Sequence, residues 1–125
     1  MNLETLQDKW KEDSVIDPDK YGEESVRIPQ LHMRYMEFYN TFSLMKKDRE
    51  SEMRGLIKSK WVYYKGKAPA TVYRDTPFDF KLTTKEEINM FIEADEDIRK
   101  LQLKIDYIEQ TILFLDSVLR QINNR

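Results

Sequence analysis

The middle of the chain combines the two kinds of side chain that bind unpaired nucleic acid, cations and aromatic rings. Within residues 58–67, four lysines are interspersed with one tryptophan and two tyrosines. Lysine neutralises phosphates and releases their counterions, while exposed bases stack on aromatic rings. A duplex would gain less from the rings, since its bases are already stacked. The alternative is that the rings pack in a core and the lysines only keep the helix soluble, because basic helix faces are common.

The cations of this region concentrate positive charge in a chain that is slightly acidic as a whole. Residues 44–67 carry eight basic side chains against three acidic ones, whereas the net charge of the whole chain is −2. On a helix with 100° per residue, four of the cations fall within about 40° of each other. We call these four the basic ridge: Lys47, Arg54, Lys58 and Lys65.

Three further residues of the stretch lie off the basic ridge. Lys60 lies about 160° from Lys58 and near the apolar stripe, so its charge must snorkel or meet a ligand or another subunit. Tyr63 is the ring that we predict to stack on a base, because the other two rings lie near the apolar stripe and are expected to pack. Lys67, beyond the predicted helix end, is expected to add a phosphate contact.

No other group of residues predicts catalysis. The chain has no cysteine, and His32 is its single histidine, which we expect to be structural or at the surface. The glycine motifs that bind dinucleotides or cradle phosphates are absent from the sequence. The acidic stretch 93–97 lacks the ligand spacing of a calcium loop and is interpreted as a solvated helix face. We therefore expect no enzyme activity, no cofactor and no metal, and a metal-dependent carboxylate site is the weakest alternative.

The elements that must position these side chains are helices, and the whole chain is expected to be one all-α domain. A short helix is predicted over residues 3–13 with Asn2 as its N-cap, because apolar residues recur there on one face. A long helix is predicted over residues 18–65. Asp17 is expected to cap it, and Pro18 suits its first position because proline lacks the N–H that would be unsatisfied there.

Proline and glycine residues interrupt the helical pattern in two places. Pro29 removes a backbone hydrogen bond inside the long helix, which predicts a kink or a break near residues 25–29. One glycine and two prolines then punctuate a connection over residues 66–83, which is long for a link between helices. Its segment ATVYRD could form a short extended piece.

The last predicted helix, residues 84–123, has the strongest periodicity in the sequence. Thr83 and Thr84 are each followed three residues later by a glutamate, which offers two registers for a capping box. Apolar residues then recur at alternating spacings of 3 and 4, the heptad pattern of a coiled coil. A second apolar row flanks this seam, so we expect one partner to be the long helix of the same chain, in an antiparallel hairpin, and the other to be another subunit. The residues predicted to mediate oligomerisation are Ile98, Leu101, Ile105, Ile108, Ile112, Leu115, Leu119 and Ile122.

The chain contains no segment that predicts a membrane or a secretory destination. No run approaches the roughly eighteen apolar residues that span a bilayer. The first thirty residues are acidic and lack the apolar centre of a signal peptide. A soluble cytosolic protein with no membrane partner is the expectation.

Three segments, spread over nearly the whole length, carry a resemblance to a known family: LETLQDKWKEDSVID, LIKSKWVYYKGKAP and EADEDIRKLQLKIDYIEQTILFLDSVL. The middle segment has the pattern basic-x-basic-x-x-Tyr-Tyr-x-Gly and is the most specific of the three. On these segments the chain resembles the UvsY family, the recombination mediator proteins of T4-like bacteriophages.

The resemblance implies a non-enzymatic homo-oligomer, a ring or barrel, that binds single-stranded DNA in the cytoplasm of the infected bacterial host. It also implies two protein partners, the phage recombinase and the phage single-strand-binding protein. The expected role is to help the first replace the second on DNA during recombination, repair and replication. The family's basic pair falls on Lys58 and Lys60, of which the second is often arginine in relatives. In the family a further segment after the last helix takes part in ring assembly, whereas this sequence ends at Arg125, so the number of subunits stays open.

A different class of function also fits the residues. A coiled-coil scaffold or adaptor could bind acidic protein partners through the same cations, without binding DNA. Binding to labelled single-stranded DNA across a salt series separates the two functions, because the scaffold would fail to bind even at low salt.

Overall fold

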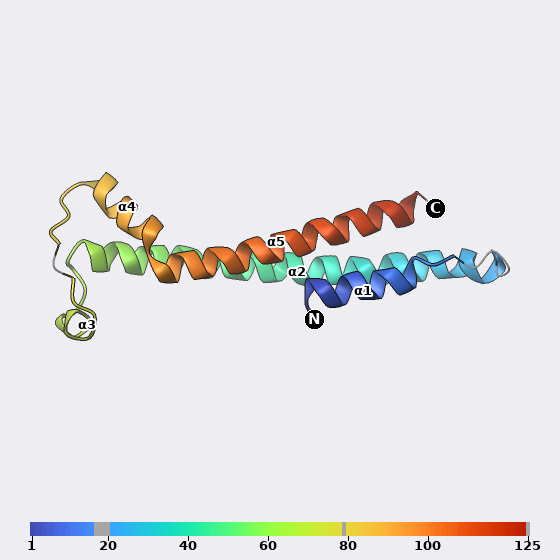
Figure 1. Ribbon diagram of the computed structural model, residues 1–125, viewed down its shortest axis with the longest axis horizontal. Helices are drawn as coiled ribbons and strands as arrows, with labels where there is room; N and C mark the ends of the chain where they lie inside the picture. The colour runs from blue at the N-terminus through green and yellow to red at the C-terminus, as the bar shows by residue number, and fades with distance from the viewer. Residues whose placement is uncertain (17–20, 79, 125) are drawn as a thin grey trace. The chain divides into compact units, whose positions relative to one another are not determined.

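The chain is all-helical, as the sequence predicts. The computed structural model describes residues 1–16, 21–78 and 80–124, and none of these residues lies in a strand. Figure 1 shows the helices in chain order. They are α1 (Leu3–Asp13), α2 (Tyr21–Tyr64), α3 (Ala70–Asp75), α4 (Lys85–Ala94) and α5 (Glu96–Asn123).

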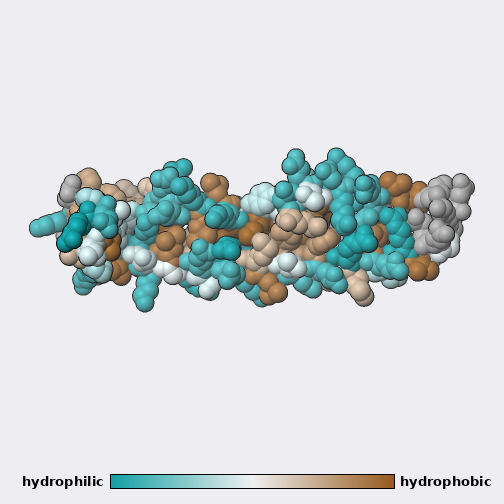
Figure 2. All heavy atoms as spheres, turned by 90° about the horizontal axis from the view of Figure 1, so that it is seen from below, coloured by the Kyte–Doolittle hydropathy of each residue, from teal (hydrophilic) through white to brown (hydrophobic). Residues whose placement is uncertain are grey.

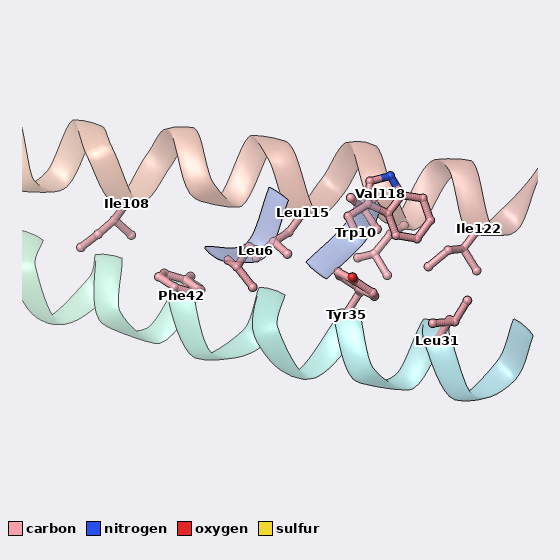
Figure 3. Packing of buried hydrophobic residues seen from close by; sticks show 10 residues of the cluster. Leu6, Trp10, Leu31, Tyr35, Phe42, Ile108, Leu115, Val118 and Ile122 are labelled. Carbon is pink, nitrogen blue, oxygen red and sulfur yellow. The ribbon is translucent and has the colours of Figure 1, made fainter. Parts of the chain in front are cut away.

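The helices build two compact units, and α2 and α5 contribute to both. The terminal unit comprises Met1–Lys46 and Tyr107–Arg125, and the central unit comprises Lys47–Asp106. In each unit the segments of α2 and α5 run antiparallel. In the terminal unit, Figure 3 shows Leu31 facing Ile122 and Phe42 facing Ile108. In the central unit, the end of α2 contacts the start of α5.

The core of the terminal unit lies between α1, the first part of α2 and the last part of α5 (Figure 3). Asn2 caps α1 as predicted, since its side-chain oxygen accepts the backbone N–H of Thr5 at 2.8 Å. Trp10 meets Tyr35 edge to face, with 5.3 Å between ring centroids. The buried residues of this core are Leu6, Trp10, Leu31, Tyr35, Phe42, Ile108, Leu115, Val118, Leu119 and Ile122.

A polar network fixes the end of α1 against α2. The Tyr35 hydroxyl donates to a carboxylate oxygen of Asp13 at 2.9 Å. Arg34 lies 3.2 Å from the same carboxylate, and Arg27 donates to the backbone oxygen of Asp13 at 2.7 Å. Burial, and then the hydrogen bond to Asp13, raise the pKa of Tyr35. The phenol therefore stays neutral and acts as a donor at physiological pH.

The core of the central unit is built by the second part of α2, by α4 and by the first part of α5. Its buried residues are Met53, Ile88, Ile92, Ile98, Leu101 and Ile105. Trp61 and Tyr64, two rings of the basic and aromatic stretch, pack against it as half-buried residues. These two rings therefore have the packing role that their place on the helix predicts.

The helix predicted over residues 84–123 is wrong in one respect, because it is divided at Asp95. Of the two capping registers, Thr84 is the N-cap of α4, and its hydroxyl accepts the N–H of Glu87 at 3.2 Å. Asp95 has extended backbone geometry, with φ −65° and ψ 133°. Its side chain accepts the N–H groups of Asp97 and Ile98, at 2.9 Å and 3.3 Å. An aspartate that caps a new helix start ends α4 and begins α5.

The connection over residues 66–83 also differs from the prediction. ATVYRD, which could have been extended, forms the short helix α3. Tyr73 anchors this helix, because its hydroxyl donates to the backbone oxygen of Tyr63 at 2.7 Å and accepts the N–H of Ala68 at 3.1 Å. Tertiary contacts of this kind override the local preference of β-branched residues for extended structure.

Of the kink or break expected near residues 25–29, the break is absent, since α2 is helical without interruption from Tyr21 to Tyr64. Pro29 is exposed, whereas Leu31 and Tyr35 in the next turns are buried in the core. Packing of the apolar face supplies most of the stability of a helix in a protein, which compensates for one missing hydrogen bond. The predicted helix start at Asp17 and Pro18 lies outside the described residues.

Candidate nucleic-acid interface

The basic ridge is formed by one face of α2 and by the residue that directly follows it. Lys47, Arg54 and Lys58 lie on α2 at spacings of seven and four residues. Because α2 is uninterrupted, these spacings place the three side chains on one face of the helix. All four residues are exposed, and none of their side chains makes an ion pair or hydrogen bond with another residue in the described ranges. Their charges are therefore available to an external anion.

The acidic residues of the same region do not neutralise the basic ridge. Arg49 pairs with Glu52 and lies 3.8 Å from the carboxylate of Asp48. Lys46, next to the ridge residue Lys47, lies 3.6 Å from Glu109. The cations that have acidic neighbours are thus different from those of the ridge, and the ridge keeps its positive potential.

The end of α2 holds the last two predicted phosphate contacts in a defined place. Gly66 has φ +82°, a left-handed conformation that glycine adopts without strain. The N–H of Gly66 donates to the Tyr63 oxygen at 3.1 Å, and the N–H of Lys67 donates to the Val62 oxygen at 3.0 Å. This pair of bonds is a Schellman motif, the common glycine-dependent helix end. Lys65 and Lys67 flank it, and both are exposed.

Lys60 does not face solvent with the basic ridge. Its ammonium lies 2.8 Å from a carboxylate oxygen of Asp97 and 3.3 Å from one of Asp95, and its side chain is only 21% exposed. Burial lowers the pKa of Lys60, but the bonds and charges of the two aspartates outweigh it and raise the pKa overall. The sequence predicts that the Lys60 ammonium must snorkel or meet a ligand or another subunit. In the structure it is paired with two carboxylates of its own chain.

Asp95 is the centre of this polar cluster. Besides capping α5, it accepts the hydroxyl of Tyr64 at 2.5 Å and lies beside Lys60. Burial raises the pKa of Asp95, and the bonds from Tyr64, from the Ile98 N–H and from Lys60 more than reverse this, so the pKa is lowered. Sequence reasoning missed this role, because it interpreted residues 93–97 as a solvated face. An aspartate followed by two further acids is an N-cap signal that could have indicated it.

Tyr63 belongs to an aromatic cluster at the end of α2. One face of its ring is stacked on Tyr73, with centroids 5.3 Å apart and planes at 16°. Its hydroxyl donates to the backbone oxygen of Thr76 at 2.8 Å. Phe78 lies 5.6 Å from the same ring. The prediction that Tyr63 stacks on a base stays a prediction, and the ring already has these neighbours in the chain.

The heptad seam is covered by the chain itself. Of the eight residues predicted to mediate oligomerisation, seven are buried and Ile112 is half-buried. They pack against α1, α2 and α4 within their units. The exposed apolar residues of α5 are instead Leu103, Tyr107 and Leu113, at 68%, 47% and 56%. An apolar interface between subunits through α5 would thus use these residues, or else require an exchange of helices between chains.

Exposed apolar side chains are found among the charged ones on the face that Figure 2 presents. No helix in the described part of the chain is long and apolar enough to cross a membrane. Within the same residues, no group of three or more acidic or histidine side chains could hold a metal ion.

The comparisons with known proteins agree with the helical architecture. A family model described as "Recombination, repair and ssDNA binding protein UvsY" matches residues 9–125. Two crystal structures of the bacteriophage T4 recombination mediator protein UvsY have a similar fold. The structure in lattice type II matches this chain with a TM-score of 0.85 at 23% sequence identity, and the structure in lattice type IV matches it with a TM-score of 0.81 at 22% identity. Each match covers 99% of this chain and 87% of the crystallised chain. No curated protein matches the sequence.

Proposed function

Because the chain belongs to the UvsY family, we propose that it binds single-stranded DNA and acts as a recombination mediator. The observation that carries the proposal is the basic ridge, which lies exposed on α2 without a partner in the described residues. Lys58 and Arg54 are its central members, one turn apart. Lys67 adds a further cation beyond the helix end.

The ridge suits a flexible, charged strand better than a compact ligand. Each phosphate neutralised by a lysine or arginine releases counterions, so affinity falls as salt rises, with a slope of about 0.7 per contact for single strands. Arginine at position 54 can also bind one phosphate in a bidentate manner. A row of cations that follows the helix axis can therefore track several phosphates in succession.

The mediator role rests on more than one copy of the chain. In this proposal the protein forms a homo-oligomeric ring or barrel that repeats the basic ridge, so weak contacts on each subunit add up along one strand. The oligomer engages a phage recombinase and a phage single-strand-binding protein, and helps the recombinase replace the other protein on DNA. The family membership and the similar fold support these steps.

Fluorescence anisotropy with a labelled single-stranded oligonucleotide, measured across a salt series, tests the DNA-binding part. Lys58→Ala is expected to weaken binding and to reduce the salt slope by about 0.7 for each phosphate that the variant no longer neutralises. Lys104→Ala is the matched control, because Lys104 is also an exposed lysine but lies on α5, off the ridge. Equal salt slopes for both variants and the wild type would contradict the assignment. Failure of the wild type to bind at low salt would favour the protein scaffold.

A further inference from the structure

Gly55 lies inside a helix at a position where the fold does not require glycine. It lies inside α2, where glycine is less favourable than alanine because it loses more conformational freedom. Its φ angle is not positive, and a Cβ atom added to it would meet no atom within 4 Å. Neither the backbone nor the packing of the described chain requires glycine. Glycine leaves the backbone uncovered, so a ligand can approach it closely at this position.

Gly55 lies in a groove beside Lys58. The groove has a volume of about 370 Å³ and belongs to the central unit. We call it the Gly55 groove, and its lining is Gly55, Lys58, Ser59, Val62, Tyr63, Ala68, Pro69 and Val72. Most of these residues are apolar, Ser59 contributes a hydroxyl, and Lys58 is the only charged residue among the described residues that line the groove. The volume lies at the lower end of the range of about 300–1,000 Å³ that is usual for small-molecule sites.

Contacts within the chain hold the two sides of the Gly55 groove together. One side is α2, and the other is α3 with the residues just before it. Tyr73 of α3 stacks on Tyr63 of α2, and its hydroxyl bonds the backbone on both sides of the helix end. The groove therefore exists before a ligand arrives, which reduces the entropic cost of binding.

We propose that the Gly55 groove takes one unstacked base of single-stranded DNA, while Lys58 binds the adjoining phosphate. This rests on the proposed function, because it names the contact that the strand makes beside the basic ridge. An apolar slot next to a cation matches the chemistry of a nucleotide, with its flat base and its charged phosphate. Bases in a duplex are paired and stacked, so they could not enter. The groove would thus add a preference for single strands to the ridge, which by itself binds any phosphate backbone.

A second copy of the chain is the other possible occupant, because small residues allow two helices to approach. The charges disfavour it. In a two-fold symmetric pair the same patch faces itself, so the Lys58 side chains of both copies would be brought together. Arg54 and Lys65, which are also exposed and without ion-pair partners in the described residues, would add to the repulsion. In a ring, where each interface joins two different surfaces, a neighbouring subunit seated in the groove would have to bury Lys58 beside apolar residues, which costs the solvation of its charge. The same cations attract a phosphate backbone.

The test fills the groove without disturbing the helix. Gly55→Leu adds a side chain with a higher helix propensity at a position where the Cβ meets open space, so its thermal midpoint should equal or exceed that of the wild type. Gly22→Leu is the matched control, since Gly22 is an exposed α2 glycine with the same open surroundings and lies outside the groove. Both variants are compared with the wild type by anisotropy on an oligothymidylate and on an abasic strand of equal length. Light scattering gives the mass of each protein.

Gly55→Leu is expected to lose about fivefold or more in affinity for the oligothymidylate, the lower end for a stacked base. Its affinity for the abasic strand and its mass should stay those of the wild type, and Gly22→Leu should behave as the wild type on both strands. Wild-type affinity of Gly55→Leu for both strands would overturn the base site and leave the proposed function intact. A changed mass with equal losses on both strands would assign the groove to a second copy. A wild type that binds neither strand would overturn the proposed function itself.

Discussion

Lys58 and Lys60 are two residues apart on one helix, yet they have different surroundings. Lys58 is exposed on the basic ridge and lines the Gly55 groove. Lys60 is held by Asp95 and Asp97 and connects α2 to the start of α5. The basic pair that the resemblance implies therefore consists of Lys58, which is exposed and unpaired in the described residues, and Lys60, whose charge is paired within its own chain.

Replacing each lysine by methionine, which keeps most of the aliphatic stem, is expected to separate these roles. Lys60→Met should lower the free energy of unfolding by about 1–3 kcal/mol, because it leaves the buried carboxylate of Asp95 without its cation. Lys58→Met should change it by less than about 0.5 kcal/mol, as is usual for exposed residues. The free energy of unfolding of each variant is measured by urea denaturation, monitored by circular dichroism. Equal stability of the two variants would contradict the anchoring role of Lys60.

Sequence reasoning placed the residues of the basic ridge correctly on one exposed face, because a 3.6-residue period is fixed once the helix is assigned. It could not find the partners of Lys60. Asp95 and Asp97 are 35 and 37 positions away in sequence, and only the packing of α5 on α2 brings them together. The helical period did predict that Lys60 lies off the ridge, because it depends only on positions along one helix.

The start of α5 depends on one ionised side chain. Asp95 caps the helix and accepts bonds from Tyr64 and Lys60, and its pKa is lowered from the ordinary value of 3.8. A lowered pKa in the folded state means that the carboxylate contributes stability above pH 3.8. This contribution is lost as the pH falls through the lower, folded-state value.

Asp95→Asn is expected to show this dependence directly. Asparagine caps a helix about as well as aspartate, so the variant keeps the cap through Oδ1. It loses the charge and the second oxygen, Oδ2, which accepts from Tyr64 and lies beside Lys60. At pH 7 it should be less stable than the wild type, and the difference should shrink as the pH falls below 3.8. Thermal unfolding at a series of pH values measures the difference. A difference that stays constant down to the lowest pH would show that the charge of Asp95 does not contribute.

The elements differ in how far local sequence predicts them. The α1 cap and the continuous face of α2 follow from short patterns around Asn2 and along the helix. The division at Asp95 has a local cap signal, the three acids that begin there, but its further partners Tyr64 and Lys60 are distant in sequence. The helix α3 depends on its contact with Tyr63 and has no such signal. Apolar periodicity continues across residue 95 and so hides the interruption.

The regular heptads of α5 predict an oligomer seam, but in the chain this seam forms the cores of both units. An oligomer of this chain in its described conformation must use other apolar residues. Leu103 and Leu113 are the exposed leucines of α5, one in the central unit and one in the terminal unit.

Substitutions at exposed and buried leucines are expected to have opposite effects on assembly and stability. Leu103→Asp or Leu113→Asp should reduce the mass measured by light scattering and leave the thermal midpoint nearly unchanged. Leu115→Ala, at a fully buried position, should cost about 2–5 kcal/mol of stability through the cavity it leaves. If only the buried substitution reduces the mass, the helices are exchanged between chains and the seam is the interface after all.

The ion pairs of Lys60 also have an evolutionary consequence. A cation whose partners are two aspartates in another helix is selected together with them, not by DNA alone. Relatives with arginine at position 60 should keep the acids at positions 95 and 97, since a guanidinium can bind carboxylates with its planar fork. Relatives that carry a neutral residue at position 60 should have lost at least one of these acids. Covariation among positions 60, 95 and 97 in relatives would thus indicate that the contact between α2 and α5 is shared across the family.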